Sequence, residues 1–199
     1  TVIHTEVRER YGSPRMTAEL NARGQSCCQN TVAKVMKANG IRVRSTRRSV
    51  RTTDSRHRLP VSANALARDF TASKPNEKWG MDVTYLPPLE GWVFLAVVAD
   101  RFSRRIVGWA MDATTTSRLV VDALRMAVSR RGTVAGLIAH SDRGSRYASD
   151  HYQSELKRYE MVGGMSGVGQ CGDNAVIEGT FGRLKVERVH GERYATREQ

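Results

Sequence analysis

The chain has 199 residues, enough to bury one good core beside a smaller appendage. Its 32 lysines and arginines outnumber 20 aspartates and glutamates, and the formal net charge of +12 points to a polyanionic partner. No run reaches the ~20 apolar residues of a membrane span, and no signal-peptide pattern is seen, so we expect a cytoplasmic, nucleoid-associated protein with no membrane partner.

Two short helices are predicted near the N-terminus. Ser13 is expected to cap the first, with Pro14 at its first helical position. Ser26 and Gln29 match a capping box for the second, which ends at Asn39–Gly40. The break of a few residues between the helices is typical of a helix-turn-helix.

Residues 1–41 are therefore predicted to form a DNA-binding segment in which Lys34 contacts DNA. The alternative is an ordinary helical hairpin with a solvated polar face. A basic linker over residues 42–65 has almost no large apolar side chain and is expected to lie along a phosphate backbone rather than in a core. The expected contacts of this linker are Arg42, Arg44, Arg47 and Arg48.

Three strands with short connections follow and predict an antiparallel meander. Residues from Trp79 to Tyr85 alternate between apolar and polar, as in a strand with two different faces. Trp92 to Val98 is a continuous apolar run, as expected for a strand covered on both faces. Arg105 to Met111 supplies the third strand.

The remainder predicts an alternation of helices and one more strand. The order is a helix, a strand, a helix, a glycine-rich loop and a last helix: Thr114–Arg131, Leu137–His140, Ser149–Tyr159, Gly163–Gly172 and Asp173–Val189. Residues 66–199 thus read as an α/β domain with a mixed sheet in the order βββαβαα.

The candidates for chemistry are carboxylates. Asp82 lies within the first strand and Asp142 directly follows the fourth, so the two meet if those strands are parallel neighbours. Glu178 lies one turn into the last helix, with Asn174 and Lys185 expected on its face. Three converging acids repel one another unless a cation intervenes, and Mg²⁺ prefers such oxygen ligands.

The alternative is that each acid has only a local structural role, as a turn contact, a cap or a solvated helix residue. Three other acids compete for the functional assignment: Asp100, Asp150 and Asp173, the last best explained as a helix cap. If the three carboxylates do converge, two bound ions suit phosphodiester chemistry on a nucleic acid backbone.

Four blocks in this order resemble the second-frame transposases of bacterial insertion sequences, in the retroviral integrase (DDE) superfamily: WGMDVTYL, FLAVVADRFSRRIVGWAM, GLIAHSDRGSRYAS and CGDNAVIEGTFGRLKVERVH. The segments YGSPRMTAEL and VAKVMKANGIRVR resemble the helix-turn-helix that precedes the catalytic domain of that family. Thirty-five residues separate Asp142 from Glu178, which is the D-35-E spacing of the superfamily.

The resemblance implies a ribonuclease H-like fold with Asp82, Asp142 and Glu178 as the catalytic and metal-binding triad for Mg²⁺ or Mn²⁺, as two ions. It implies metal-dependent cleavage of a DNA 3′ end and direct strand transfer to a target. The residues expected on DNA in this domain are Arg143, Asn174 and Lys185.

The resemblance also implies homo-multimers on DNA and fusion, by frameshifting, to an upstream-frame helix-turn-helix product. The family's chains extend beyond both ends of this sequence, so a C-terminally truncated core is expected. The retroviral relatives carry a zinc module of paired His and paired Cys, whereas here Cys27 and Cys28 are adjacent and His4 stands alone, so no structural zinc is predicted.

Two further functions compete with the strand transferase. A non-catalytic DNA-binding protein or inactive transposase remnant rests on the helix-turn-helix and the basic linker. A ribonuclease H-like nuclease shares the fold but has no need of the preceding helix-turn-helix.

Overall fold

The computed structural model describes residues 2–43, 62, 64–66, 69, 71–87, 89–132, 135–167, 175–189, 192 and 194–196. The chain divides into two compact units. The N-terminal unit comprises residues 1–49 with 185–191, and the sheet unit comprises residues 50–184 with 192–199. Most of the predicted linker lies outside the described residues.

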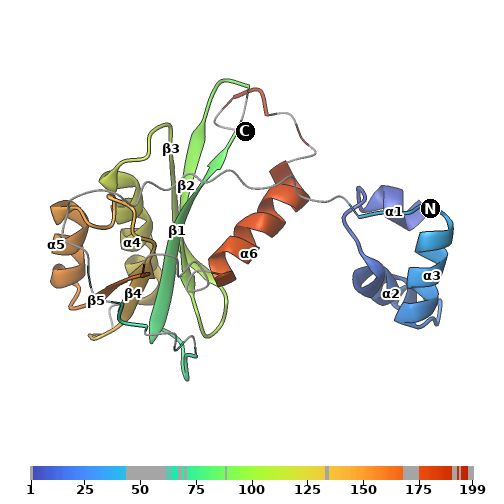
Figure 1. Ribbon diagram of the computed structural model, residues 1–199, viewed down its shortest axis with the longest axis horizontal. Helices are drawn as coiled ribbons and strands as arrows, with labels where there is room; N and C mark the ends of the chain where they lie inside the picture. Colours follow the sequence, from blue (N-terminus) through green and yellow to red (C-terminus); the bar gives the residue numbers. More distant parts are fainter. Residues whose placement is uncertain are drawn as a thin grey trace. The chain divides into compact units, whose positions relative to one another are not determined.

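The N-terminal unit contains α1 (Val2–Glu6), α2 (Ser13–Ala22) and α3 (Gln29–Ala38) (Figure 1). Val32 and Met36 are four residues apart, share one face of α3 and pack against Met16 of α2. The predicted pair of helices is confirmed, and α1 is an addition that the sequence pattern did not reveal.

The predicted serine caps are wrong. Ser13 is itself the first residue of α2, and α3 begins only after Cys28, which keeps an extended backbone. The turn before α3 is held by Asn21 instead, whose Oδ1 accepts a hydrogen bond from the Cys27 amide at 3.0 Å. Ser26 is therefore too far from the helix start to cap it.

The sheet unit is built on a five-stranded mixed sheet in the order β3-β2-β1-β4-β5. Its strands are β1 (Lys78–Leu86), β2 (Val93–Asp100), β3 (Ile106–Asp112), β4 (Ile138–Ser141) and β5 (Val162–Met165). The first three form the predicted antiparallel meander, while β4 is parallel to β1 and β5 is parallel to β4.

Strand β5 corrects the prediction of a glycine-rich loop from Gly163. Both glycines of this strand lie where a side chain would collide with its neighbours. A Cβ at Gly163 would be 2.9 Å from Leu156 Cδ1, and one at Gly164 would be 3.1 Å from His140 Nδ1. These residues serve close packing rather than flexibility, and the observed order is βββαβαβα.

Helices cover both faces of the sheet. Figure 1 shows α4 (Ser117–Arg131) and α5 (Asp150–Arg158) on one side and α6 (Ala175–Leu184) on the other. The larger core joins α4 and α5 to the sheet, and a smaller core holds Ile177 and Phe181 of α6 against β2.

The last predicted helix ends earlier than expected. The α-helix stops at Leu184, and Lys185–Val189 form a π-helical segment. This segment belongs to the N-terminal unit, where Arg15 Nη1 lies 2.5 Å from Glu187 Oε1.

Gly108 permits the close approach of α4 to β3. A Cβ at this position would lie 2.3 Å from the Ala123 carbonyl oxygen and 2.6 Å from the Ala127 nitrogen, both backbone atoms that cannot move alone. We expect Gly108→Ala to lower the free energy of unfolding by about 3 kcal/mol or more, measured by urea denaturation. The control is Gly182→Ala in α6, where a Cβ meets nothing within 4 Å and helix propensity should raise stability by roughly 0.5–1 kcal/mol. Equal effects of the two variants would contradict this account.

Candidate active site

The register of β1 and β4 brings two acids together. The strands are parallel, with Met81 opposite Ser141, so Asp82 and Asp142 are the next residues along the two neighbouring strands. Adjacent strands lie about 4.8 Å apart. The expectation that the two strands are parallel neighbours is confirmed.

Asp82 is partly buried in the middle of β1. Its Oδ1 accepts a hydrogen bond from the Val83 amide at 2.8 Å. Burial first, and then the charges of Asp142 and Glu178, raise the pKa of Asp82 to about 7. The carboxylates thus act on one another electrostatically, while the Val83 amide and Arg146 oppose the shift.

Asp142 begins the turn after β4. Its Oδ1 accepts from the Gly144 amide at 3.0 Å, which fixes the carboxylate against its own backbone. A Cβ at Gly144 would lie 3.0 Å from that same oxygen and 3.2 Å from Arg146 Nη2. The glycine two residues after the acid therefore leaves room for the carboxylate and the guanidinium together.

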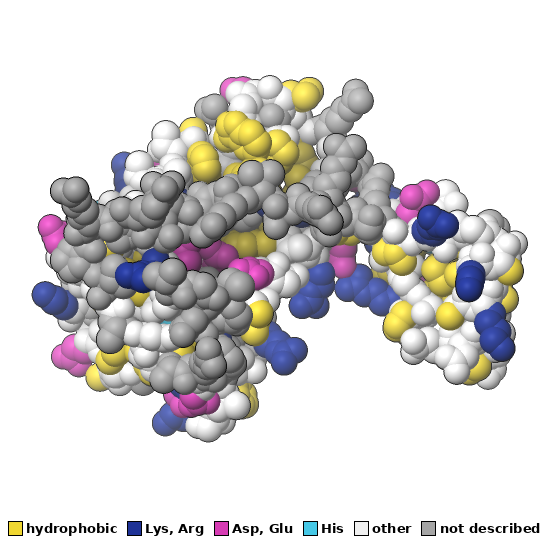
Figure 2. Space-filling view, in the orientation of Figure 1, with side chains coloured by type: hydrophobic (Ala, Val, Ile, Leu, Met, Phe, Trp, Pro, Cys, Tyr) yellow, Lys and Arg dark blue, Asp and Glu magenta, His cyan; other side chains and the backbone are white. Residues whose placement is uncertain are grey.

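Glu178 is exposed on α6, on the face of the sheet to which Asp82 points. The helix is seated by Ile177, because its Cδ1 would be 2.8 Å from a Cβ at Gly80, two residues before Asp82 on the same side of β1. Figure 2 shows acidic side chains gathered near the middle of this view of the sheet unit.

The donor set of these acids consists of oxygens only, as hard divalent cations prefer. Among the described residues, no three His, Cys, Asp or Glu side chains stand close enough together to hold a metal ion as they are arranged. The mutual repulsion that raises the pKa of Asp82 is the feature that a cation would relieve.

The residues predicted to contact DNA are placed as follows. Lys34 of α3 and Arg42 are exposed in the N-terminal unit, and Arg143 is partly buried in the turn after Asp142. Lys185 does not continue the face of Glu178 along one α-helix, because the π-helical segment begins at this residue and belongs to the N-terminal unit. The others lie outside the described residues: Arg44, Arg47, Arg48 and Asn174.

Sequence reasoning missed two residues of the same turn, Arg146 and Tyr147. The Arg146 guanidinium donates a hydrogen bond to Thr115 Oγ1, and its charge lowers the pKa of Asp82. Tyr147 is fully buried, and burial together with the charges of Asp142 and Asp82 raises its pKa. Both follow Asp142 within five residues, and an Arg-Tyr pair closing a polar turn was the available signal.

The Tyr147 hydroxyl is buried and has no hydrogen-bond partner in the described part of the chain. We expect Tyr147→Phe to leave stability unchanged or raise it by about 1 kcal/mol, because an unsatisfied buried hydroxyl is removed. Tyr152→Phe is the control, since its hydroxyl donates to Met81 Sδ at 3.0 Å and its ring packs edge-on against Tyr147. Urea denaturation should give the Tyr147 variant a higher free energy of unfolding than the Tyr152 variant. The reverse order would contradict the view that only the Tyr147 hydroxyl lacks a partner among the described residues.

Comparison with known proteins places this geometry in a family. A model of the integrase core domain matches residues 72–171, and a model of a helix-turn-helix-like domain matches residues 1–49. The transposase InsF of insertion sequence IS3A from Escherichia coli K12 is 46% identical over 194 residues, which cover 98% of this chain and 67% of the relative. The chain belongs to the IS3-type insertion-sequence transposases.

A second relative is the 31 kDa protein of insertion element IS600 from Shigella sonnei. It is 36% identical over 198 residues, covering 100% of this transposase and 73% of the relative. The family match to the integrase core contains Asp82 and Asp142 and ends before Glu178.

Solved integrase structures are similar to this chain. The intasome of simian T-cell lymphotropic virus, in complex with the PP2A subunit B56 gamma, superposes with a TM-score of 0.54 at 19% identity, covering 92% of this transposase and 57% of that chain. The HTLV-2 integrase catalytic core, solved with magnesium, has a TM-score of 0.49 at 23% identity. The match covers 58% of this transposase and 71% of that chain. The match to the intasome chain confirms the predicted ribonuclease H-like fold. None of the described helices of the transposase is long and apolar enough to cross a membrane.

Proposed function

We propose that this transposase cuts the 3′ ends of its element and joins them to target DNA by phosphodiester hydrolysis and transesterification, with Asp82, Asp142 and Glu178 as the catalytic carboxylates. The observation that carries the proposal is the parallel register that makes Asp82 and Asp142 neighbours. Glu178 is also close enough for its charge to raise the pKa of Asp82.

The three carboxylates suit Mg²⁺ or Mn²⁺, and we propose two ions held by Asp82, Asp142 and Glu178. The fit rests on the all-oxygen donors and on the raised pKa of Asp82, which follows from burial first and then from the charges of Asp142 and Glu178. When bound, such ions activate the attacking water or 3′-hydroxyl and stabilise the leaving oxygen of a phosphodiester.

The protein's own contribution is orientation. The amides of Val83 and Gly144 hold one oxygen each of Asp82 and Asp142, which fixes the orientation of both carboxylates. Arg146 adds a positive charge beside this pair, where a phosphate oxygen of the substrate would lie.

DNA contact outside the catalytic centre is part of the proposal. We infer that residues 1–41 form the DNA-binding domain, that residues 42–65 link it to a core over residues 66–199, and that the protein acts as a multimer on two DNA ends in the cytoplasm. An upstream-frame partner fused by frameshifting is also proposed. The side chains assigned to DNA are Lys34, Arg42, Arg44, Arg47, Arg48, Arg143, Asn174 and Lys185.

The test is an assay on a labelled duplex that bears the end of the flanking element, with Mg²⁺, Mn²⁺ or EDTA. Cleavage and strand-transfer products that need the metal support the proposal. Salt-sensitive DNA binding with no product under any of these conditions would favour a non-catalytic DNA-binding protein. Preferential cleavage of an RNA:DNA hybrid would favour a ribonuclease H-like nuclease.

A further inference from the structure

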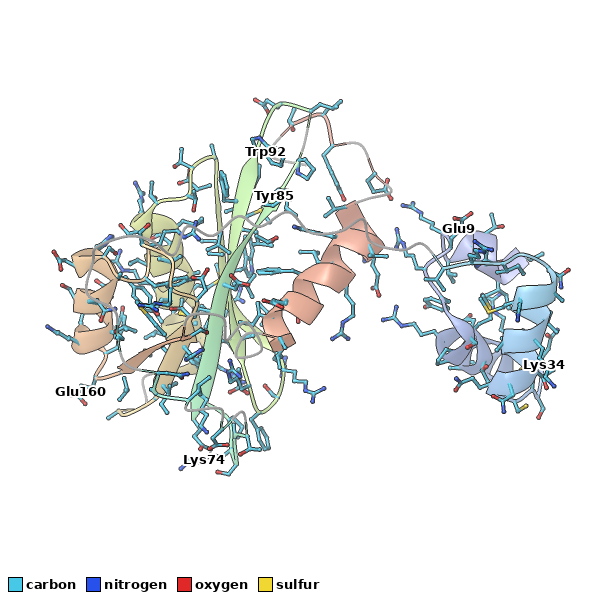
Figure 3. The ribbon with its side chains drawn as sticks, in the orientation of Figure 1. Glu9, Lys34, Lys74, Tyr85, Trp92 and Glu160 are labelled. Atoms are coloured by element: carbon cyan, nitrogen blue, oxygen red, sulfur yellow. The ribbon has the colours of Figure 1, made fainter. Side chains whose placement is uncertain are left out.

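One end of the sheet carries exposed cations that the catalytic centre does not use. β1 begins here, β2 ends here and β3 begins here, and α4 also ends here. Four side chains define the surface that we name the basic end: Lys74, Arg104, Arg105 and Arg130. All four are exposed. Figure 3 labels Lys74 at the lower end of β1.

A single buried carboxylate gathers these segments. Asp100 is fully buried and accepts hydrogen bonds from the amides of Asn76 at 3.0 Å and Ser103 at 2.9 Å. Arg131 of α4 reaches the same carboxylate at 3.9 Å. The Asp100 amide in turn donates to the Arg105 carbonyl at 2.9 Å, closing the turn between β2 and β3. The segments that carry these cations are therefore held together by hydrogen bonds to Asp100.

The backbone of that turn holds Arg104 in an unusual conformation. Arg104 has a φ of 56°, in the left-handed region that favours glycine. An arginine here carries a conformational cost that glycine would avoid. Such a conformation persists where the surrounding structure imposes it, and here the turn is closed by the hydrogen bonds of Asp100.

The acids of this end are already engaged. Glu77 accepts from the Ser73 hydroxyl and amide at 2.8 and 2.7 Å, and Asp69 pairs with the buried Lys78 at 2.7 Å. Within the described residues, no ion pair links a carboxylate to any cation of the basic end, so no described acid is paired with these four side chains.

The basic end is separate from the catalytic centre but close enough for one duplex to touch both. Lys78 and Asp82 lie four residue steps apart along β1, about 13 Å at the rise of a strand. Unpaired guanidinium groups on a rigid turn match phosphate oxygens and carry no means of reading bases.

Resting on the proposed function, we propose that the basic end is a second DNA-binding surface, which holds the phosphate backbone of duplex DNA independently of sequence. It adds contacts outside the acidic centre and outside the helix-turn-helix. The element end and the target DNA could both bind to the basic end, because both have the same phosphate backbone.

The test is DNA binding by the full chain in EDTA, where no cleavage occurs, on an element-end duplex and on an unrelated duplex over a range of salt. The variant R104Q/R105Q is compared with K157Q/R158Q, which also removes two adjacent cations but at the end of α5, by the opposite edge of the sheet. We expect the first variant to reduce the slope of log K against log salt by about 1.8, at about 0.9 per lost phosphate contact, on both duplexes. The control should leave the slope close to that of the wild type.

A third variant separates folding from binding. Arg104→Gly suits the left-handed backbone, so its midpoint of thermal unfolding should be maintained or raised while the salt slope falls by about 0.9. Equal slopes for R104Q/R105Q and its control, or a loss confined to one duplex sequence, would overturn the proposal. Failure of the catalytic proposal is seen separately, as an absence of metal-dependent products from a wild-type protein that binds DNA normally.

Discussion

Asp142→Asn should abolish metal-dependent cleavage and strand transfer, with a loss on the order of 10³-fold or more, while the fold and DNA binding persist. The change is nearly isosteric, and the amide oxygen can still accept from Gly144, so the turn after β4 should survive. What is lost is one negative charge beside Asp82. The measurement is product formation on the element-end duplex at saturating Mg²⁺, and Glu178→Gln is expected to behave alike.

The control for this prediction is Asp150→Asn. Asp150 is an exposed acid in the first turn of α5, eight residues after Asp142, and its loss removes the same charge from the same region of the chain. Stability should fall by only a few tenths of a kcal/mol, through the helix dipole. Activity of Asp150→Asn should match the wild type. Undiminished activity of Asp142→Asn, or an equal loss in both variants, would remove Asp142 from the catalytic set.

Asp82→Asn should stabilise the metal-free protein, increasingly so as the pH rises. The folded-state pKa of Asp82 is about 7, above its ordinary value of 3.8, so the folded state favours the protonated carboxyl. Well below pH 3.8 both states are protonated and the group has no effect on stability. As the pH rises from 4 to 7, the unfolded state ionises freely while the folded state does not, and stability is lost.

The gain from Asp82→Asn is therefore expected to be on the order of 1–2 kcal/mol at pH 5 and 3–4 kcal/mol at pH 8. Urea denaturation in EDTA at both pH values measures it as a difference from the wild type. Asp112→Asn is the control of opposite sign, because the Thr114 amide and hydroxyl lower the pKa of Asp112. A pH-independent effect of Asp82→Asn would show that like-charge repulsion and burial do not act at this site.

The helices and strands of the sheet unit were largely predictable because their signals are local. Alternation from Trp79 to Tyr85 and the apolar run from Trp92 report which faces are buried, and both depend only on neighbouring residues. Glycines misled the prediction at β5, since the composition of residues 163–165 resembles a loop. Only the packing of α5 and His140 against that strand shows why side chains are absent there.

The candidate site divides in the same way. The sequence alone determined the basic character of the protein, the order of its main elements, and the acids available for chemistry. These features depend only on composition and on the periodicity of neighbouring residues. The tertiary structure decided which acids meet, because the pairing of Met81 with Ser141 joins strands about 60 residues apart. It also decided the raised pKa of Asp82 and the basic end assembled around Asp100, because burial and charge proximity depend on contacts between segments that no local pattern encodes.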